Sequence, residues 1–162
     1  MNQRGLTLLE VFILVIVIGI LAALFIPPTC GDGLRTNCSA NLGQLYKVGT
    51  IYASMHKGEW PGIAGDELWL SFTRTTPPLI EEEHRAILAC RVQGEECAPG
   101  ETHYRGPRVP WKQLRPGEPL AADKPGNHGD DYGGNVLFKD GSVHEAALRD
   151  PLWQQCAEKL RP

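Results

Sequence analysis

The chain has 162 residues, a length that suits one small folded domain with one additional element. Charged residues make up 22% of the chain and the formal net charge is −3, so the composition does not favour nucleic acid as a partner. The chain has 18 glycines and 13 prolines, and 11 of the prolines follow Trp60, which predicts a C-terminal part rich in loops with short secondary-structure elements.

An almost unbroken apolar run extends from Leu6 to Pro27. A helix rises about 1.5 Å per residue, so about 20 such residues would cover the ~30 Å core of a bilayer, and the run predicts a membrane-spanning helix. A signal peptide would be shorter and would end in a small-x-small cleavage site, whereas this run ends in Ile26-Pro27-Pro28. A plain membrane anchor leaves Glu10 unexplained, because a carboxylate is costly in a membrane helix.

Residues 4–10 (RGLTLLE) resemble the type IV prepilin motif, in which a short basic leader ends in Gly and Glu is the fifth residue of the mature chain. The resemblance implies that a prepilin peptidase cuts between Gly5 and Leu6 and methylates the new amine of Leu6. It also implies that Glu10 pairs with that amine on a neighbouring subunit and sets the register of a filament. Leu6 is a mild departure, since family members often have Phe at this position.

These features predict three segments along the chain: a prepilin leader (1–5), a hydrophobic transmembrane and filament-core helix (6–28), and a globular pilin-like domain (29–162). Arg4 is the only charged side chain before the apolar run, so the positive-inside tendency keeps the N-terminus cytoplasmic and exports the rest. The expected location is the bacterial inner membrane, in a single pass with a periplasmic domain, and the cell surface or a filament after assembly.

A second helix is predicted after Pro27 and Pro28, which should loosen the first. Apolar residues recur at spacings of three to four between Leu42 and Met55, the period of an amphipathic helix. The expected fold is therefore α+β: a long N-terminal hydrophobic helix continues into an amphipathic helix that packs on a small antiparallel β-sheet, as in pilins.

The sequence pattern of the C-terminal part predicts the strands of that sheet. Two apolar stretches, 135–138 and 142–145, flank the turn signal Lys139-Asp140-Gly141, which indicates a β-hairpin, and residues 120–122 are expected to form a third strand. A short helix should follow, with Asp150 as its cap and Pro151 in its first position.

Two segments resemble one group of pilin-like proteins, the DUF1559 type with an H-x₉-DG ending. Residues 38–44 (CSANLGQ) resemble the Cys-x-x-Asn-Leu-x-Gln stretch of that group, and residues 128–141 resemble its ending. Here eleven residues, not nine, separate His128 from Asp140, and the extra pair falls in a loop, where an insertion costs little.

Asp123, His128 and Asp140 are candidate ligands of a divalent cation where strand ends meet. Oxygen ligands would suit calcium, the candidate cofactor. In the alternative interpretation, the two aspartates accept hydrogen bonds from turn backbone and His128 bonds to a carboxylate, and this alternative is favoured about two to one.

The five cysteines lack the short spacing of a zinc site. Disulfides are expected if the domain is exported, and Cys90 with Cys97, which bracket a short polar loop, is the leading pair. Cys38 would pair with Cys30 or Cys156, and the odd count leaves at least one thiol over.

The favoured function is a structural subunit of a type IV pilus or type II secretion pseudopilus. Its expected partners are other pilin or pseudopilin subunits, the prepilin peptidase, the inner-membrane assembly platform and the membrane. The alternative is a single-pass, membrane-anchored binding module for a cation or glycan that forms no filament. An enzyme is not expected, because no catalytic motif is recognised.

Overall fold

The structure is a computed structural model that describes residues 12–18 and 30–161. The chain divides into two compact units, residues 1–31 and 32–162. In the first unit, residues 12–18 are helical, and the apolar side chains from Phe12 to Ile18 are 45–61% exposed.

The prediction of a membrane-spanning N-terminal helix was wrong for the part of the chain that the structure describes. No helix among residues 12–18 and 30–161 combines the length and the apolar character needed to cross a bilayer. The long helix at 30–55 carries Arg35, Asn37 and Lys47 among its residues. The fold is α+β, with a five-stranded antiparallel sheet.

The sheet has the strand order β4-β3-β2-β1-β5, and neighbouring strands are antiparallel. The strands are β1 (Tyr104–Pro107), β2 (Pro119–Asp123), β3 (Gly134–Phe138), β4 (Val143–Ala146) and β5 (Leu160–Arg161). The predicted hairpin is β3–β4 and the predicted third strand is β2. The two-residue strand β5 adds to the outer edge of β1, pairing Leu160 with Pro107.

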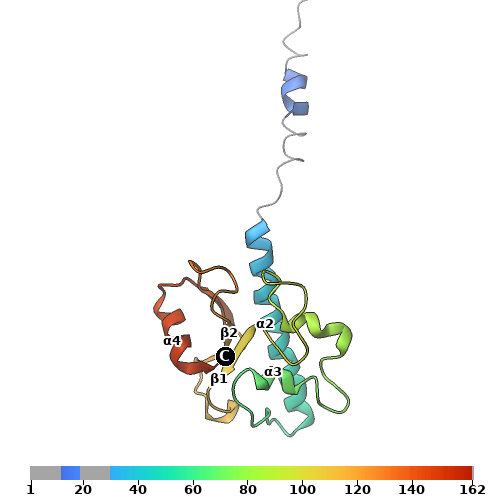
Figure 1. Ribbon diagram of the computed structural model, residues 1–162, viewed down its shortest axis with the longest axis vertical. Coiled ribbons are helices and arrows are strands. Elements are labelled where there is room, and N and C mark those ends of the chain that lie inside the picture. The colour runs from blue at the N-terminus through green and yellow to red at the C-terminus, as the bar shows by residue number, and fades with distance from the viewer. Residues whose placement is uncertain (1–11, 19–29, 162) are drawn as a thin grey trace, which may run out of the picture. The chain divides into compact units, whose positions relative to one another are not determined.

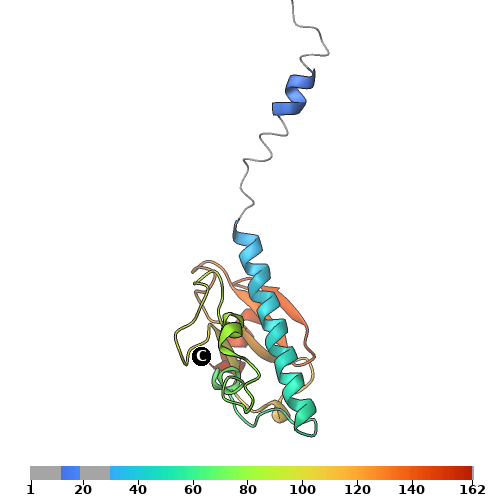
Figure 2. The ribbon, with the colours of Figure 1, turned by 90° about the vertical axis from the view of Figure 1, so that its right-hand side faces the viewer.

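Helix α2 (Cys30–Met55) is the longest element and lies along one face of the sheet (Figures 1 and 2). It begins earlier than the apolar period from Leu42 suggested, and Gly31 and Gly33 lie within its first turns. Leu42 and Leu45 are fully buried beside Leu120 and Leu137 of the sheet, so the helix packs through the predicted apolar stripe.

The opposite face of the sheet carries a smaller core under α4 (Pro151–Lys159), so the sheet is covered on both sides (Figure 1). Adjacent residues of β3 show the division, since Leu137 belongs to the core on the α2 side and Val136 to the core under α4. Asp150 caps α4 by accepting a hydrogen bond from the backbone N–H of Leu152, with Pro following it, as predicted.

The connection between α2 and β1 contains α3 (Glu67–Ser71) and a 3₁₀ helix, η1 (Glu82–Leu88); a second 3₁₀ helix, η2 (Trp111–Gln113), follows β1. Trp69 and Phe72 of this connection are fully buried. The segment after η1 then runs back beside α2, which brings Cys90 to the helix.

Candidate functional site

Four potential ligand side chains meet inside the globular unit: Cys38, Cys90, Asp123 and His128. Their ligand atoms all lie within 4.8 Å of one another, and all four residues are buried. They come from four places in the chain: α2, the segment after η1, the end of β2, and the loop that follows β2. Because its two thiols, carboxylate and imidazole could together hold a metal ion, this cluster is the candidate functional site among the described residues.

Cys38 and Cys90 are in direct contact, with 2.7 Å between their Sγ atoms. The segment that carries Cys90 is fixed from the α2 side by Asn41, whose Nδ2 donates to the carbonyl of Ala89 at 2.9 Å. Cys38 and Asn41 are three positions apart on α2 and therefore face the same way. Because of the Cys-x-x-Asn spacing, one face of α2 contacts the segment after η1 through two side chains, Cys38 at Cys90 and Asn41 at Ala89.

Strand β1 and the two residues before it fix this segment from the other side. The hydroxyl of Tyr104 donates to the carbonyl of Ala89 at 3.0 Å, and the backbone N–H of Cys90 donates to Nδ1 of His103 at 3.0 Å. Thr102 donates its hydroxyl to the carbonyl of Leu88 at 3.0 Å. Since the backbone is held from both α2 and β1, the position of Cys90 against Cys38 follows from the packing of the whole domain.

Asp123 organises the remaining half of the cluster. Its Oδ2 accepts hydrogen bonds from Nε2 of His128 at 2.8 Å, from the backbone N–H of Asn135 at 2.7 Å, and from Nδ2 of Asn135 at 3.0 Å. Within the described part of the chain, Oδ1 of Asp123 and Nδ1 of His128 are buried without a hydrogen-bond partner. The carboxylate therefore joins β2, β3 and the intervening loop at one point.

The cluster shifts the proton affinities of its members. The hydrogen bond that His128 donates to Asp123, followed by the one with Cys38, raises the pKa of His128 to about 9. The hydrogen bond donated by the Cys90 thiol, together with that from His128, lowers the pKa of Cys38 to about 5, against the effect of burial. The same contact with Cys38, and then burial, raises the pKa of Cys90. The reduced cluster therefore favours a thiolate on Cys38 beside a protonated His128.

The structure brings together two of the three predicted calcium ligands. Asp123 and His128 are neighbours, but Asp140 is not part of the cluster, because it lies in the β3–β4 turn and accepts hydrogen bonds from the backbone and hydroxyl of Ser142. The other two potential ligands beside Asp123 and His128 are the sulfurs of Cys38 and Cys90. Calcium takes oxygen ligands, whereas zinc accepts sulfur, nitrogen and carboxylate oxygen, so the donor set does not match the predicted ion.

The two cysteines of the predicted Cys90–Cys97 pair have different neighbours in the structure. Cys90 faces Cys38, whereas Sγ of Cys97 points to the carbonyl of Leu88 at 3.2 Å. Cys156 lies in the core under α4. The side chain of Cys30 lies outside the described residues, as do Gly5, Leu6 and Glu10 of the prepilin-like motif.

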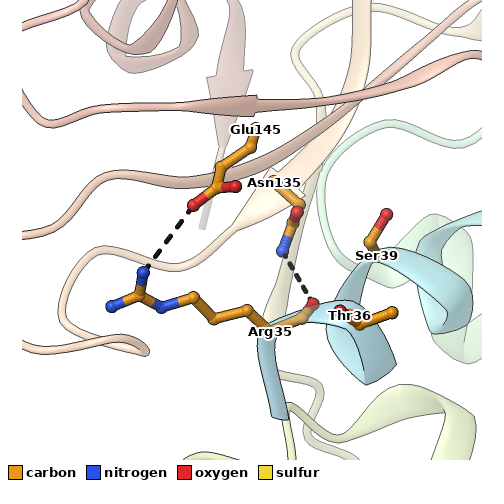
Figure 3. Close-up of a pocket in the computed structure, with 5 residues that line it drawn as sticks. All are labelled: Arg35, Thr36, Ser39, Asn135 and Glu145. Carbon is orange, nitrogen blue, oxygen red and sulfur yellow. Dashed lines mark hydrogen bonds and ion pairs between the residues drawn. The ribbon is translucent and has the colours of Figure 1, made fainter. Parts of the chain in front are cut away.

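A surface pocket of about 260 Å³ borders the cluster (Figure 3). Arg35, Thr36 and Ser39 of α2 line one side, and Asn135 and Glu145 line the other. Arg35 faces Glu145 at 3.8 Å, and Nδ2 of Asn135 donates to the Arg35 carbonyl at 3.4 Å. Asn135 thus stands between the pocket and Asp123.

Chemically, the cluster can hold a metal ion or form a disulfide. Cysteine, histidine and aspartate are also the residue types of a nucleophilic site, but Cys38 and Cys90 have no exposed surface, so a substrate has no access to either sulfur in this conformation. Comparisons of the chain with models of protein families, with curated proteins and with solved structures find no match.

Proposed function

We propose that the chain is a structural subunit of a filament of the type IV pilus or type II secretion pseudopilus kind, processed between Gly5 and Leu6. The observation that carries the proposal is the prepilin-like motif directly before a long apolar run. The described turns of that run, residues 12–18, expose seven consecutive apolar side chains by 45–61%. A contiguous apolar surface of this kind marks an interaction site, and the occupant proposed here is the same segment of neighbouring subunits.

Glu10 supplies the specificity of that association. Cleavage after Gly5 leaves a cationic amine on Leu6, and the carboxylate of a neighbour can neutralise it where packed helices exclude water. At about 4 Å and an effective dielectric near 20, such a pair gains roughly 4 kcal/mol before desolvation is subtracted. Removing one member strands the other charge and typically costs about 3–5 kcal/mol. Apolar packing supplies affinity, and the ion pair sets the register.

The globular unit is suited to be the folded domain that such a subunit carries outside the packed N-terminal segments. Its charged side chains are mainly exposed and its core is closed on both faces of the sheet, so it can fold without contributing to the apolar contact. A prepilin peptidase and an assembly platform are the partners that this function requires.

The test compares the filament incorporation of wild type, Glu10→Gln and the matched control Glu95→Gln at equal expression. Glu95 is an exposed carboxylate of the globular unit, so its variant makes the same chemical change outside the apolar segment. Both variants should be processed to a chain that begins with methylated Leu6. We expect sheared filaments to contain wild type and Glu95→Gln, and Glu10→Gln to be strongly depleted.

Two results contradict the proposal. Equal incorporation of Glu10→Gln and Glu95→Gln would remove the assembly role of Glu10. A mass spectrum of protein from its native cell that shows Met1 to Gly5 retained would remove the processing step, and with it the cationic amine that Glu10 needs.

A further inference from the structure

We propose that Cys38 and Cys90 are joined by a disulfide in the exported protein, a covalent link between α2 and the segment after η1. The inference rests on the proposed function for its compartment, because export takes the domain into an oxidising environment. It rests on the structure for the choice of partners, because the two Sγ atoms are in contact at 2.7 Å although the residues are 52 positions apart.

The other cysteines with described side chains do not compete for this pairing. Sγ of Cys97 is directed to the Leu88 carbonyl, and Cys156 packs with Trp153 and Leu160 in the core under α4. Cys38 and Cys90 are fully buried, so no thiol outside the cluster reaches them once the domain has folded.

A metal ion fits the same cluster less well. In a tetrahedral zinc site, bond lengths near 2.3 Å place two sulfurs about 3.8 Å apart, so Cys38 and Cys90 would have to separate. A ligating histidine normally donates its second nitrogen to a neighbour, but Nδ1 of His128 has no partner in the described structure. Oδ2 of Asp123 accepts three hydrogen bonds, which hold β3 and the loop after β2, so among the carboxylate oxygens only Oδ1 is left for an ion.

Formal charge also favours the disulfide. Oxidation removes both ionisable sulfurs and leaves the Asp123–His128 pair, whose charges cancel when His128 is protonated. Two thiolates, a carboxylate and a neutral imidazole around a divalent ion would instead leave one uncompensated negative charge. A buried net charge is costly, so the oxidised cluster is the better one for a closed core.

The reaction is a thiol–disulfide exchange with an oxidised dithiol oxidoreductase. The Cys38 thiolate attacks one sulfur of the oxidant's disulfide, that bond breaks, and a mixed disulfide forms. The Cys90 sulfur, after giving up its proton to solvent, then attacks Cys38 and releases the oxidant as a dithiol. Two electrons leave the chain, and the exchange must precede the final docking of α2, because both sulfurs are buried afterwards.

The link has a consequence for a filament subunit. It fastens the long helix to the body of the domain, so that a force along α2 cannot peel the helix from the sheet without breaking a covalent bond. Closing a loop of this length should lower the unfolding equilibrium constant between about 30-fold and about a thousand-fold.

The experiment uses the full chain and two arms. In the first, protein from its native cell is denatured in alkylating reagent without reductant, digested and mapped, with Cys38→Ser, Cys90→Ser and the matched control Cys97→Ser alongside. In the second, reduced protein is refolded in a buffer of oxidised and reduced glutathione, which supplies the oxidant independently of the cell. Bound zinc is measured on the native protein.

We expect a peptide linked through Cys38 and Cys90 in wild type and Cys97→Ser, and none in the other two variants. Reductant should lower the urea midpoint of wild type without any substitution, which keeps the test valid if a serine variant fails to fold. Free alkylation of both thiols after refolding with glutathione, a link to another cysteine, or one zinc per chain that protects both thiols would each overturn the proposal. The N-terminal peptide is read separately, so a retained Met1 beside an intact Cys38–Cys90 link overturns only the filament function.

Discussion

The buried His128–Asp123 pair should make the stability of the folded domain fall as the pH rises from neutral to alkaline. The pKa of His128 is raised from an ordinary value of 6.5 to about 9, mainly by the hydrogen bond that His128 donates to Asp123. A group whose pKa is higher in the folded state stabilises that state most fully below its unfolded pKa and loses the effect above its folded pKa. The window is therefore about pH 6.5 to about 9.

The structure sets the size of the effect. The difference between the two pKa values corresponds to up to about 3 kcal/mol in the free energy of unfolding. The His128 side chain is only 2% exposed, so solvent screens little of its interaction with Asp123. Cys38 and Cys90 also face His128, and in the reduced protein the lowered pKa of Cys38 gives a contribution that grows with pH and opposes the histidine. In the oxidised protein the two cysteines no longer titrate, so the pH dependence of stability reports His128 alone. The rise in the pKa of His128 is then somewhat smaller, since its contact with the Cys38 thiolate is lost.

The assay is urea unfolding of the oxidised protein, followed by tryptophan fluorescence, at several pH values from 6 to about 9.5. Wild type should lose stability across the window, and Asp123→Asn should be less stable at pH 6 and nearly flat above it. His144→Asn, which changes an exposed histidine, should follow wild type. A wild-type profile as flat as that of Asp123→Asn would refute the reasoning, because it would mean that His128 is neutral in the folded state.

Two further substitutions test the packing of the helices. A Cβ at Gly49 would overlap the ring of Trp60, which is stacked on Trp111, so Gly49→Ala should cost about 1–3 kcal/mol in urea unfolding, whereas Gly43→Ala, in open space on the same helix, should be neutral or stabilising. Asp150→Ala removes the cap of α4 and should cost about 1 kcal/mol by the same measurement, and Asp150→Ser should restore most of it.

Local signals predicted the elements of the sheet well. The β3–β4 hairpin follows from a turn sequence between apolar stretches, and the cap of α4 follows from Asp150 before Pro151; both depend on neighbours in the chain. The apolar period also located the buried stripe of α2. It did not locate the start of the helix at Cys30, because the apolar period begins only at Leu42.

The site was less accessible to sequence reasoning. Cys90 was paired with its near neighbour Cys97, since a sequence shows short separations but not the path by which the segment after η1 returns to α2. The one usable signal was the spacing of Cys38 and Asn41, which places both on one helix face. Asp123 and His128 were selected correctly as neighbours, while Asp140 was grouped with them although its turn uses the carboxylate locally.

The outer edges of the sheet matter for the filament role that we propose, in which the protein would be crowded with copies of itself. An open strand edge is a template on which another chain can add a strand. β5 occupies the free side of β1 for two residue pairs, and on the other border β4 carries Glu145, which is held by Arg35. In the proposed filament, the short strand β5 and the charged side chain on β4 would help the globular unit to resist cross-β aggregation while the N-terminal segments associate. Leu160→Pro should loosen β5, expose the edge of β1 and promote aggregation of the globular unit.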